Sequence, residues 1–447
     1  MENDGNGGDS RSEQRPRWKS VLRALRHRNY QLFFFGQGVS QVGTWMQRVA
    51  QGWLVYDLTH SKLQLGVVGF STYIFTFLAA PFAGVLADRM NRRRLLIVIQ
   101  SIMMIQAFAL AALTWTHAVT VGQIIALSMI LGLVSAFDVP VRQSFVVEMI
   151  EDKADLSNAI ALNSVLFNGA KLVGPSIAGA LVAMVGEAAC FGLNGASFLA
   201  VIAALFAMRV RPRETLAQRK HVFHNLWEGL LYAVRFAPIR ALLFQLGIVS
   251  LLGSSYAVLM PVFAKDILHG GPQTLGLLMA ASGVGAAAGA LTLAARKDVR
   301  GLGRVIAAST FLFGISLIGF GLSRSFALSA FLLVLAGFGM MGQMASCNTV
   351  IQTIVDEDKR GRVMSFYTVA LMGMMPFGSL LAGALANWIG ASWAVVLCGG
   401  GCALAALQFA FRLPALRKDV LPIYVRLGIA SETALAPIPV VENSPLA

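Results

Sequence analysis

The chain has 447 residues, of which 56% are hydrophobic and only 13% are charged, and its mean hydropathy is +0.68. Soluble domains carry charge on about a quarter of their residues, so this composition excludes a soluble enzyme with a large core. The formal net charge of +14 would indicate nucleic acid as a partner of a soluble protein. Here the apolar residues gather in runs long enough to cross a bilayer, so we expect the lipid bilayer as a partner and no nucleic acid.

The N-terminal segment, residues 1–29, is polar at first and then basic. Its last part has apolar residues at helical spacing with lysine and arginine between them, and these are Trp18, Val21, Leu22 and Leu25. This pattern predicts an amphipathic helix that lies in the membrane interface beside anionic headgroups. A solvated basic tail is the alternative.

Twelve apolar spans follow the N-terminal segment. They are predicted at residues 30–56, 64–87, 95–116, 119–147, 156–185, 188–208, 239–264, 273–295, 304–323, 326–354, 361–387 and 391–412. If successive connections alternate between the two sides of the membrane, nearly all lysines and arginines fall on the side of the N-terminus. The other side receives only Lys62, Lys265 and Arg324. This asymmetry predicts twelve transmembrane helices with both termini in the cytoplasm.

The spans form two sets of six that repeat one another. A shift of 204 residues places Gly169 on Gly373 and Gly174 on Gly378, and both sets have the same orientation, so the repeat is parallel. We expect an all-α membrane protein built from two such halves. Its expected parts are a cytoplasmic tail over 1–29, a six-helix bundle over 30–208, a cytoplasmic linker over 209–238, a second six-helix bundle over 239–412 and a cytoplasmic tail over 413–447.

Polar side chains follow one face of the first span, and they are Gln37, Gln41, Thr44, Arg48 and Gln51. A polar group in hydrocarbon is costly, so this face meets either a cavity or a partner helix. Hydrogen bonds between helices are the alternative to a cavity. Arg48 favours a substrate cavity, because a cation at this depth requires water, a carboxylate or an anionic ligand.

Further polar residues lie within spans four, seven and ten, as a central aqueous path requires, and these are Asp138, Gln245, Gln343 and Asn348. Asp138 lies well inside its span, where it either pairs with Arg142 or Lys171 or serves as a proton site. Asp57 and Asp266, near the outer ends of spans one and seven, are the other candidates for proton coupling.

The chain shows no pattern of catalytic or metal-binding residues. Its six histidines lie at span ends or in connections, its four cysteines lie in apolar runs, and no nucleotide-binding glycine loop occurs. We therefore expect no cofactor, no metal ion and no enzymatic activity. A membrane-embedded enzyme, the alternative from another class, would need clustered acids or histidines at one interface.

The connection between spans two and three reads GVLADRMNRRR over residues 84–94. Twelve spans in two parallel halves with this connection resemble the major facilitator superfamily, whose signature is roughly G-x-L-x-D-R-x-G-R-[RK]-[RK]. The matching residues are Gly84, Leu86, Asp88, Arg89, Arg92 and Arg93. Asn91 replaces a glycine of the signature, and asparagine tolerates the left-handed backbone that we expect there.

The resemblance implies alternating access, in which two halves rock about a central site. In that scheme the connection over residues 84–94 acts as a conformational latch in the outward-open state. Asp88 would then meet the positive N-terminal end of span eleven and an arginine of span four, for which Arg142 is the candidate. The matching connection of the second half, residues 295–304, keeps the cations but has no aspartate in register.

A narrower resemblance is to the drug and siderophore exporter branch that contains the enterobactin exporter. It rests on residues 28–61, 139–150, 158–181 and 358–367, and on a motif similar to that of antiporters, formed by Lys171, Gly174, Pro175 and Gly179. This branch implies a monomeric secondary exporter of small amphipathic molecules, drugs or siderophores, driven by protons across the bacterial inner membrane. Uptake, or flipping of lysophospholipids by the same fold, is the alternative.

Overall fold

A computed structural model describes residues 22–150, 152–209, 231–296 and 298–429, without the side chains of residues 80–89, 153 and 358. The regular structure of this described part is entirely helical, which confirms the predicted all-α class. Its elements are η1 (Arg23–Arg26), α2 (Arg28–Thr59), α3 (Lys62–Arg89), α4 (Arg92–Trp115), α5 (Val121–Met149), η2 (Lys153–Asp155), α6 (Leu156–Val185), α7 (Glu187–Ala207), α9 (Ala237–Val262), η3 (Phe263–Ile267), α10 (Pro272–Ala294), α11 (Leu302–Leu322), α12 (Phe326–Ile354), α13 (Glu357–Met372), α14 (Met375–Ile389) and α15 (Ala391–Arg426).

Eleven membrane-crossing candidates, long and apolar enough by length and composition, occur among the described helices. α9 and η3 together form one candidate, and α13 and α14 form another. α2 is 32 residues long but is not among the eleven. Its polar face lowers its hydropathy, which is the property expected of a helix that lines a polar path rather than facing lipid all round.

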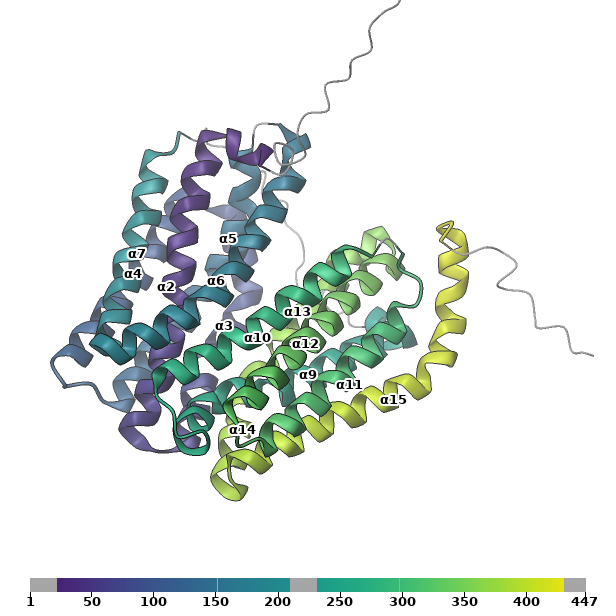
Figure 1. Ribbon diagram of the computed structural model, residues 1–447. Helices are drawn as coiled ribbons and strands as arrows, with labels where there is room; N and C mark the ends of the chain where they lie inside the picture. The colour runs from purple at the N-terminus through teal and green to yellow at the C-terminus, as the bar shows by residue number, and fades with distance from the viewer. Residues whose placement is uncertain (1–21, 151, 210–230, 297, 430–447) are drawn as a thin grey trace, which may run out of the picture.

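Two predicted spans differ from the observed helices. The eleventh span is interrupted at Gly373 and Met374, between α13 and α14. The last helix, predicted to end at residue 412, continues to Arg426 with Pro414 and Pro422 inside it. Figure 1 shows this last part of α15 turning away from the direction of the rest of the helix. A proline removes a backbone hydrogen bond and crowds the preceding turn, so it bends the helix without ending it here.

The predicted amphipathic segment near the N-terminus lies largely outside the described residues. Trp18 and Val21 come before the first described residue, Leu22. The chain after them forms the short 3-10 helix η1 instead of an α-helix. η1 is held on the first turn of α6, because the Ala24 backbone N–H donates to Asn158 Oδ1 at 2.9 Å. Most of the predicted cytoplasmic linker over 209–238 falls in residues 210–230, which the structure does not describe.

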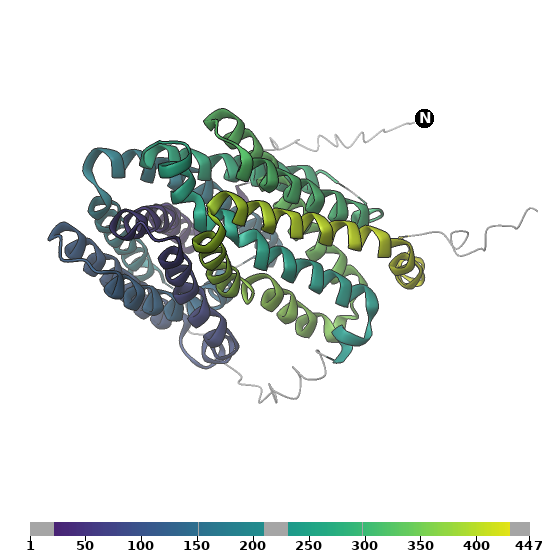
Figure 2. The same cartoon turned by 90° about the horizontal axis from the view of Figure 1, so that it is seen from below.

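The helices pack in two groups that lie side by side (Figures 1 and 2). The first group contains α2 to α7 and the second contains α9 to α15. The main contacts between the groups join α6 to α10 and α3 to α14. We call the side of the membrane on which α2 begins the inner side, and the opposite side the outer side. In Figure 1 the groups meet at the bottom of the view and diverge toward the top, where α2 begins.

Glycines bring the two groups into close contact at their outer ends. A Cβ atom on Gly66 of α3 would lie 2.6 Å from the carbonyl oxygen of Ser379 and 2.9 Å from the Cα of Gly383 in α14. A Cβ atom on Gly179 of α6 would lie 3.1 Å from the Cα of Gly276 in α10. Small residues of this kind permit helices to approach backbone to backbone in a membrane.

The contact between α6 and α10 ends near the middle of both helices. A Cβ atom on Gly283 of α10 would lie 3.2 Å from the Cα of Leu172 in α6. Residues four apart share one face of a helix, so Asn168 and Ser164 continue this face toward the inner side. Asn168 is half-buried and Ser164 is exposed. The face of α6 that meets the second group is therefore covered on the outer side and uncovered on the inner side.

The second contact between the groups shows the same pattern. A Cβ atom on Gly373 would lie 2.7 Å from the ring of Phe77 in α3. One and two turns closer to the inner side, Val369 and Ser365 of α13 are exposed. The groups are thus closed together on the outer side and apart on the inner side, which is an inward-facing arrangement. We call the space between these uncovered faces the central cleft.

Candidate functional site

The polar residues of α2 divide between helix packing and the central cleft. Gln37 and Gln51 are buried within the first group. Gln51 Nε2 donates to Ser128 Oγ of α5 at 2.8 Å, and Gln37 Oε1 accepts from Arg142 of α5 at 3.5 Å. Thr44 is half-buried and donates its hydroxyl to the carbonyl oxygen one turn earlier. The alternative of hydrogen bonds between helices therefore holds for both buried glutamines.

Arg48 lies on the side of α2 that faces the second helix group. Its side chain is exposed. Val39 is also exposed, but it is nine residues earlier, which is two and a half helical turns, so it lies on the opposite side of α2. One turn toward the outer side, a Cβ atom on Gly52 would lie 3.5 Å from Pro261 in α9. Gln41, half-buried, lies two turns closer to the inner side on the same face. This geometry places Arg48 at the outer end of the central cleft.

Arg48 and Lys171 lie against one aromatic ring. Arg48 Cζ is 4.7 Å from the centroid of the Trp45 ring, and Lys171 Nζ is 5.9 Å from it. Trp45 is fixed in turn by α6, because a Cβ atom on Gly174 would lie 2.6 Å from the Cβ of Trp45. Phe167 makes an edge contact with the indole at 6.3 Å between ring centroids. We call Trp45, Arg48 and Lys171 the indole–cation cluster.

Asp138 is enclosed by polar side chains of the first group. Gln100 Nε2 of α4 donates to Asp138 Oδ1 at 2.9 Å, and an Arg142 amino nitrogen lies 3.5 Å from Asp138 Oδ2. Asp138 and Arg142 are each 7% exposed. Of the two pairings open for Asp138, the structure contains the one with Arg142, and Lys171 has no ion pair within the described residues.

A second buried polar group escaped the sequence interpretation. Gln47 Nε2 of α2 donates to Gln106 Oε1 of α4 at 3.0 Å, and Asn194 Nδ2 of α7 donates to Gln47 Oε1 at 2.7 Å. All three side chains are buried. The sequence does contain a signal for these three residues. Each is a single amide side chain within an apolar span, and such a side chain needs a polar partner in the membrane.

The outer closure carries polar contacts between α2 and the π-helix η3. Lys265 Nζ lies 2.5 Å from Asp57 Oδ1, and the Tyr56 hydroxyl donates to Asp266 Oδ2. Lys265 Nζ is also 5.8 Å from the centroid of the Trp53 ring. Asp57 of α2 thus contacts η3, and Asp266 of η3 contacts α2, across the outer closure. We call Tyr56, Asp57, Lys265 and Asp266 the outer clasp; Tyr56 and Lys265 were not among the predicted site residues.

The polar residues of the second group lie apart from those of α2. Gln245 is buried in α9, and its Nε2 atom has no hydrogen-bond partner among the described atoms. Gln343 is buried in α12 and contacts Cys347 Sγ at 3.7 Å, whereas Asn348 is half-buried and accepts from Gln352. The sequences of α10, α12 and α14 contain no charged residue, so these three helices of the second group offer an uncharged wall in the membrane.

The residues of the predicted conformational latch are only partly described. Gly84, Asp88 and Arg89 belong to the inner end of α3, and their side chains lie outside the description. The side chain of Arg92, at the start of α4, lies 2.5 Å from Glu148 Oε1 at the inner end of α5. Glu148 was not predicted as a site residue. Its contact ties α4 to α5 beside the latch.

The turn between α3 and α4 differs in detail from the expectation. Asn91 has a φ of −63°, not the left-handed conformation that we expected from its place in the signature. Its side chain instead accepts a hydrogen bond from the Arg94 backbone N–H at 3.1 Å and so caps α4. Arg93 Nε donates to the carbonyl oxygen of Leu205 at 2.7 Å, which joins the turn to the end of α7.

The antiporter-like motif of α6 packs that helix on both sides. Gly174 makes room for Trp45 of α2, and Gly179 makes room for α10. The carbonyl oxygen of Pro175 also faces α10, where it would contact a Cβ atom on Gly276. α6 is therefore wedged between the first span and the second helix group by residues of this motif.

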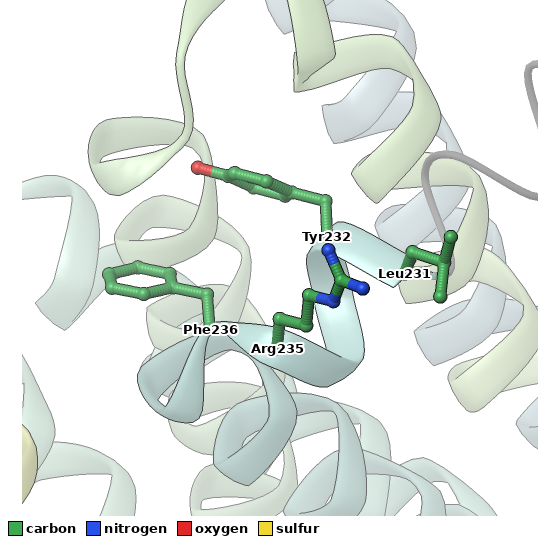
Figure 3. A pocket seen from close by; sticks show the side chains of 4 residues that line it. All are labelled: Leu231, Tyr232, Arg235 and Phe236. Carbon is green, nitrogen blue, oxygen red and sulfur yellow. The ribbon is translucent and has the colours of Figure 1, made fainter.

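A surface hollow of about 460 Å³ lies beside the start of α9 (Figure 3). Its lining residues are Leu231, Tyr232, Arg235 and Phe236. The Tyr232 ring is already covered by Lys359 of α13, whose Nζ lies 4.7 Å from the ring centroid. None of the predicted site residues lines this hollow, so we do not assign the transport path to it.

Comparison with known proteins places the chain in a family. It matches the transmembrane secretion effector family over residues 19–424. It is 26% identical over 373 residues to the staphyloferrin A transporter of Staphylococcus aureus, covering 80% of this chain and 89% of that protein. It is 24% identical over 405 residues to the multidrug efflux pump Tap of Mycolicibacterium fortuitum, covering 88% and 95%. It is 25% identical over 410 residues to the enterobactin exporter of Citrobacter koseri, covering 90% and 96%.

The fold is similar to that of solved transporters. A bacterial homologue of the human lysosomal transporter Spinster superimposes with a TM-score of 0.70 at 14% sequence identity, covering 88% of this chain and 98% of that one. A transporter of the POT family superimposes with a TM-score of 0.69 at 13% identity, covering 87% and 96%. The protein is therefore a membrane transporter and not an enzyme, and it belongs to the transmembrane secretion effector family in the drug and siderophore exporter branch of the major facilitator superfamily.

Proposed function

We propose that this transporter exports small amphipathic molecules, drugs or siderophores, from the cytoplasm in exchange for protons. Export is supported by the relatives named as an enterobactin exporter and a multidrug efflux pump. The observation that carries the exchange is the loose hold on Arg142. Its amino nitrogens lie 3.5 Å from Asp138 and from Gln37, and its Nε atom has no partner. Charge-assisted hydrogen bonds are usually about 2.7–2.9 Å long, so this guanidinium is free to change partners.

The exchange of partners by Arg142 couples the conformational latch to a proton. In the inward-facing arrangement Arg142 lies beside Asp138. In the outward-facing arrangement Arg142 turns to Asp88 at the inner closure, and Asp138 loses its countercharge. An unpaired carboxylate within the membrane is costly, so Asp138 then takes up a proton from the outer side. The return of Arg142 in the inward-facing arrangement releases that proton to the cytoplasm.

The outer clasp sets the balance between the two arrangements instead of carrying the proton. Asp57 and Asp266 stay at the outer ends of their helices, so they cannot face the cytoplasm in turn. Opening to the outer side separates α2 from η3 and breaks both contacts of the clasp. Protonation of either acid from an acidic outer side weakens the clasp and favours this opening.

The latch residues then close the inner side. Gly84, Asp88, Arg89, Arg92 and Arg93 surround the inner ends of α3 and α4. We infer that Asp88 meets the N-terminal end of α13 when the inner ends approach, because a helix N-terminus attracts a carboxylate. Substrate reaches Gln41 and Arg48 through the central cleft before this closure.

We place both termini in the cytoplasm of a bacterium and the chain, as a monomer, in the inner membrane. The distribution of lysine and arginine supports this orientation, since cytoplasmic connections carry an excess of both. The two helix groups of a single chain bound the cleft, so transport by this route needs no second copy.

Inverted membrane vesicles test export directly. Their cytoplasmic face is outside, so export appears as accumulation of a fluorescent substrate in the lumen. We expect accumulation when the lumen is acidified and none after nigericin collapses the pH gradient. Net exit from preloaded vesicles would indicate uptake, and accumulation that ignores the pH gradient would overturn proton exchange.

A further inference from the structure

The geometry points to the indole–cation cluster of Trp45, Arg48 and Lys171 as an anion-binding site in the transport path. Its ligand carries a carboxylate or sulfonate attached to an apolar or aromatic body. This inference rests on the proposed export function and names the chemical class of the substrate. The site joins α2 to α6, and both helices contact the second helix group at the outer closure.

The cluster lies near the middle of the membrane. Arg48 is 11 residues from the outer end of α2 at Thr59, and Lys171 is 14 residues from the outer end of α6 at Val185. At 1.5 Å per residue these positions are about 16 Å and 21 Å from the outer ends of their helices. The hydrocarbon core is about 30 Å thick, so both cations lie near its centre.

The two cations have no anionic partner within the described residues. Two of the ion pairs in the described part of the chain join Asp138 to Arg142 and Asp57 to Lys265, and these pairs use acids of α5 and α2. The indole face partly compensates both charges, because each lies within about 6 Å of the ring centroid. Two like charges at one ring still repel each other, and an anion that reaches both relieves this repulsion.

The cluster is held in place before any ligand arrives. The Cβ of Trp45 is packed on Gly174, and its indole makes an edge contact with the ring of Phe167. A fixed ring holds both cations near one point, so less ordering is needed when the anion binds. A guanidinium also offers two parallel N–H groups to a carboxylate or sulfonate.

The surroundings define the rest of the ligand. The Arg48 face of α2 meets α9 one turn away, where Gly52 contacts Pro261. On α6, the backbone at Lys171 is close to α10, because the carbonyl oxygen of Lys171 would lie 3.5 Å from a Cβ atom on Gly283. The spans of α10, α12 and α14 carry no charge, so the part of the ligand that faces these helices is uncharged. The site also lies where the covered outer part of the faces meets the uncovered inner part, as alternating access requires.

Two dyes of one ring system test the charge preference. Sulforhodamine B carries two sulfonates, whereas rhodamine 6G is a cation. Fluorescence anisotropy measures the binding of each dye to the purified full chain in phosphatidylcholine nanodiscs. We expect the wild type to bind sulforhodamine B, and Arg48→Gln and Lys171→Gln each to weaken this binding by about tenfold or more. Rhodamine 6G binds these variants as well as the wild type or better.

Matched variants separate the site from a general loss of charge or of folding. Arg304→Gln removes an exposed cation at the inner end of α11 and leaves sulforhodamine B binding unchanged. Arg48→Lys retains most of the affinity, and Trp45→Phe lowers it less than Arg48→Gln does. Unfolding temperatures of all variants are measured in the same nanodiscs to exclude misfolding as the cause.

Several outcomes overturn the inference. These are no binding of sulforhodamine B by the wild type, an equal loss of both dyes in the glutamine variants, and unchanged binding in Arg48→Gln. Displacement of the dye by phosphatidylglycerol in the nanodisc would assign the site to a lipid headgroup and overturn its role for a soluble substrate. The measurement uses no pH gradient, so anion binding that persists without proton-driven export refutes only the proposed function.

Discussion

Trp45 connects the residues of the first span to the motif of α6. Its Cβ lies where only a glycine at position 174 leaves room, and its ring lies beside both cations of the site. The glycine of the antiporter-like motif thus acts through a side chain of another helix. A sequence pattern on α6 alone contains no information about this neighbour.

Gly174→Ala tests this contact. The new Cβ would lie 2.6 Å from the Cβ of Trp45, so the ring or the helix must shift. Overpacking of this kind costs about 1–3 kcal/mol. We expect a lower unfolding temperature and weaker binding of anionic substrate, measured by thermal unfolding and by dye anisotropy.

Gly169→Ala on the same helix is the matched control. Nothing lies within 4 Å of a Cβ atom at this position, and alanine is a better helix former by about 1 kcal/mol. Its unfolding temperature therefore stays equal or rises. If both variants behave alike, the contact between α6 and Trp45 has no special role.

The sequence identified the polar residues within the spans better than it identified the groups that they contact. Polar groups within apolar spans identify Gln37, Arg48 and Asp138 from the sequence, because hydrocarbon penalises them wherever they point. The sequence left open whether each faces a cavity or a helix. Gln37 and Gln51 are buried within the first group while Arg48 is exposed, and this difference depends on how α2 is rotated against its neighbours.

At the scale of helices, glycine contacts decide which side of the transporter is closed. Gly66 and Gly383 join α3 to α14, and Gly179 and Gly276 join α6 to α10. Both contacts lie on the outer side, so both must open when the transporter faces outward. Larger residues at these positions favour the outward-facing arrangement.

Gly383→Ala tests the closure. Its Cβ would lie 2.9 Å from the Cα of Gly66 and 2.9 Å from the carbonyl oxygen of Lys62. Both atoms belong to the backbone of α3, so the helices must separate. We expect more labelling of a cysteine introduced at position 379 by an impermeant maleimide applied from the outer side. Gly400→Ala, with nothing within 4 Å of its Cβ, leaves the labelling unchanged.

Weakening the outer clasp should also increase labelling from the outer side, but by less than Gly383→Ala does. The side chains of Lys265 and Asp57 are 28% and 51% exposed, and exposed ion pairs contribute about 0–1 kcal/mol. We therefore expect Lys265→Gln to increase the outer labelling by up to about fivefold with little change in unfolding temperature. A large fall in unfolding temperature, or labelling below the wild-type value, would contradict a role for this pair in the closure.

Helix positions were largely predictable, while interruptions within them were not. Apolar runs and cationic connections identify the spans, because lipid imposes both length and charge asymmetry. The break at Gly373 and Met374 lies just before Pro376 in the first turn of α14, and the extension of α15 passes through Pro414 and Pro422. A proline marks a position where a helix can bend or break, but the local pattern does not specify whether the helix ends there or continues.

At the scale of the whole molecule, charge is distributed unequally between the two helix groups. Arg48, Asp138, Arg142 and Lys171 lie within the spans of the first group, while α10, α12 and α14 of the second carry no charge. The parallel repeat therefore preserves helix packing but not chemistry. We propose that the first group holds the anion and the proton, and that α10, α12 and α14 of the second group supply an uncharged wall that moves against it.

Proton exchange through Asp138 is the central claim. Asp138→Asn keeps the size of the side chain, and its amide oxygen can still accept the hydrogen bond from Gln100. The amide cannot carry a proton across the membrane. Asp419→Asn, an exposed acid at the inner end of α15, is the control.

The most direct test is the internal pH of proteoliposomes that contain trapped pyranine and start with an acidic lumen. Sulforhodamine B is added outside, and its entry is measured together with the pyranine signal. We predict that dye entry makes the lumen more alkaline for the wild type and for Asp419→Asn, and that Asp138→Asn abolishes the pH change. Dye entry without any pH change in the wild type, or an unchanged response in Asp138→Asn, would contradict the account.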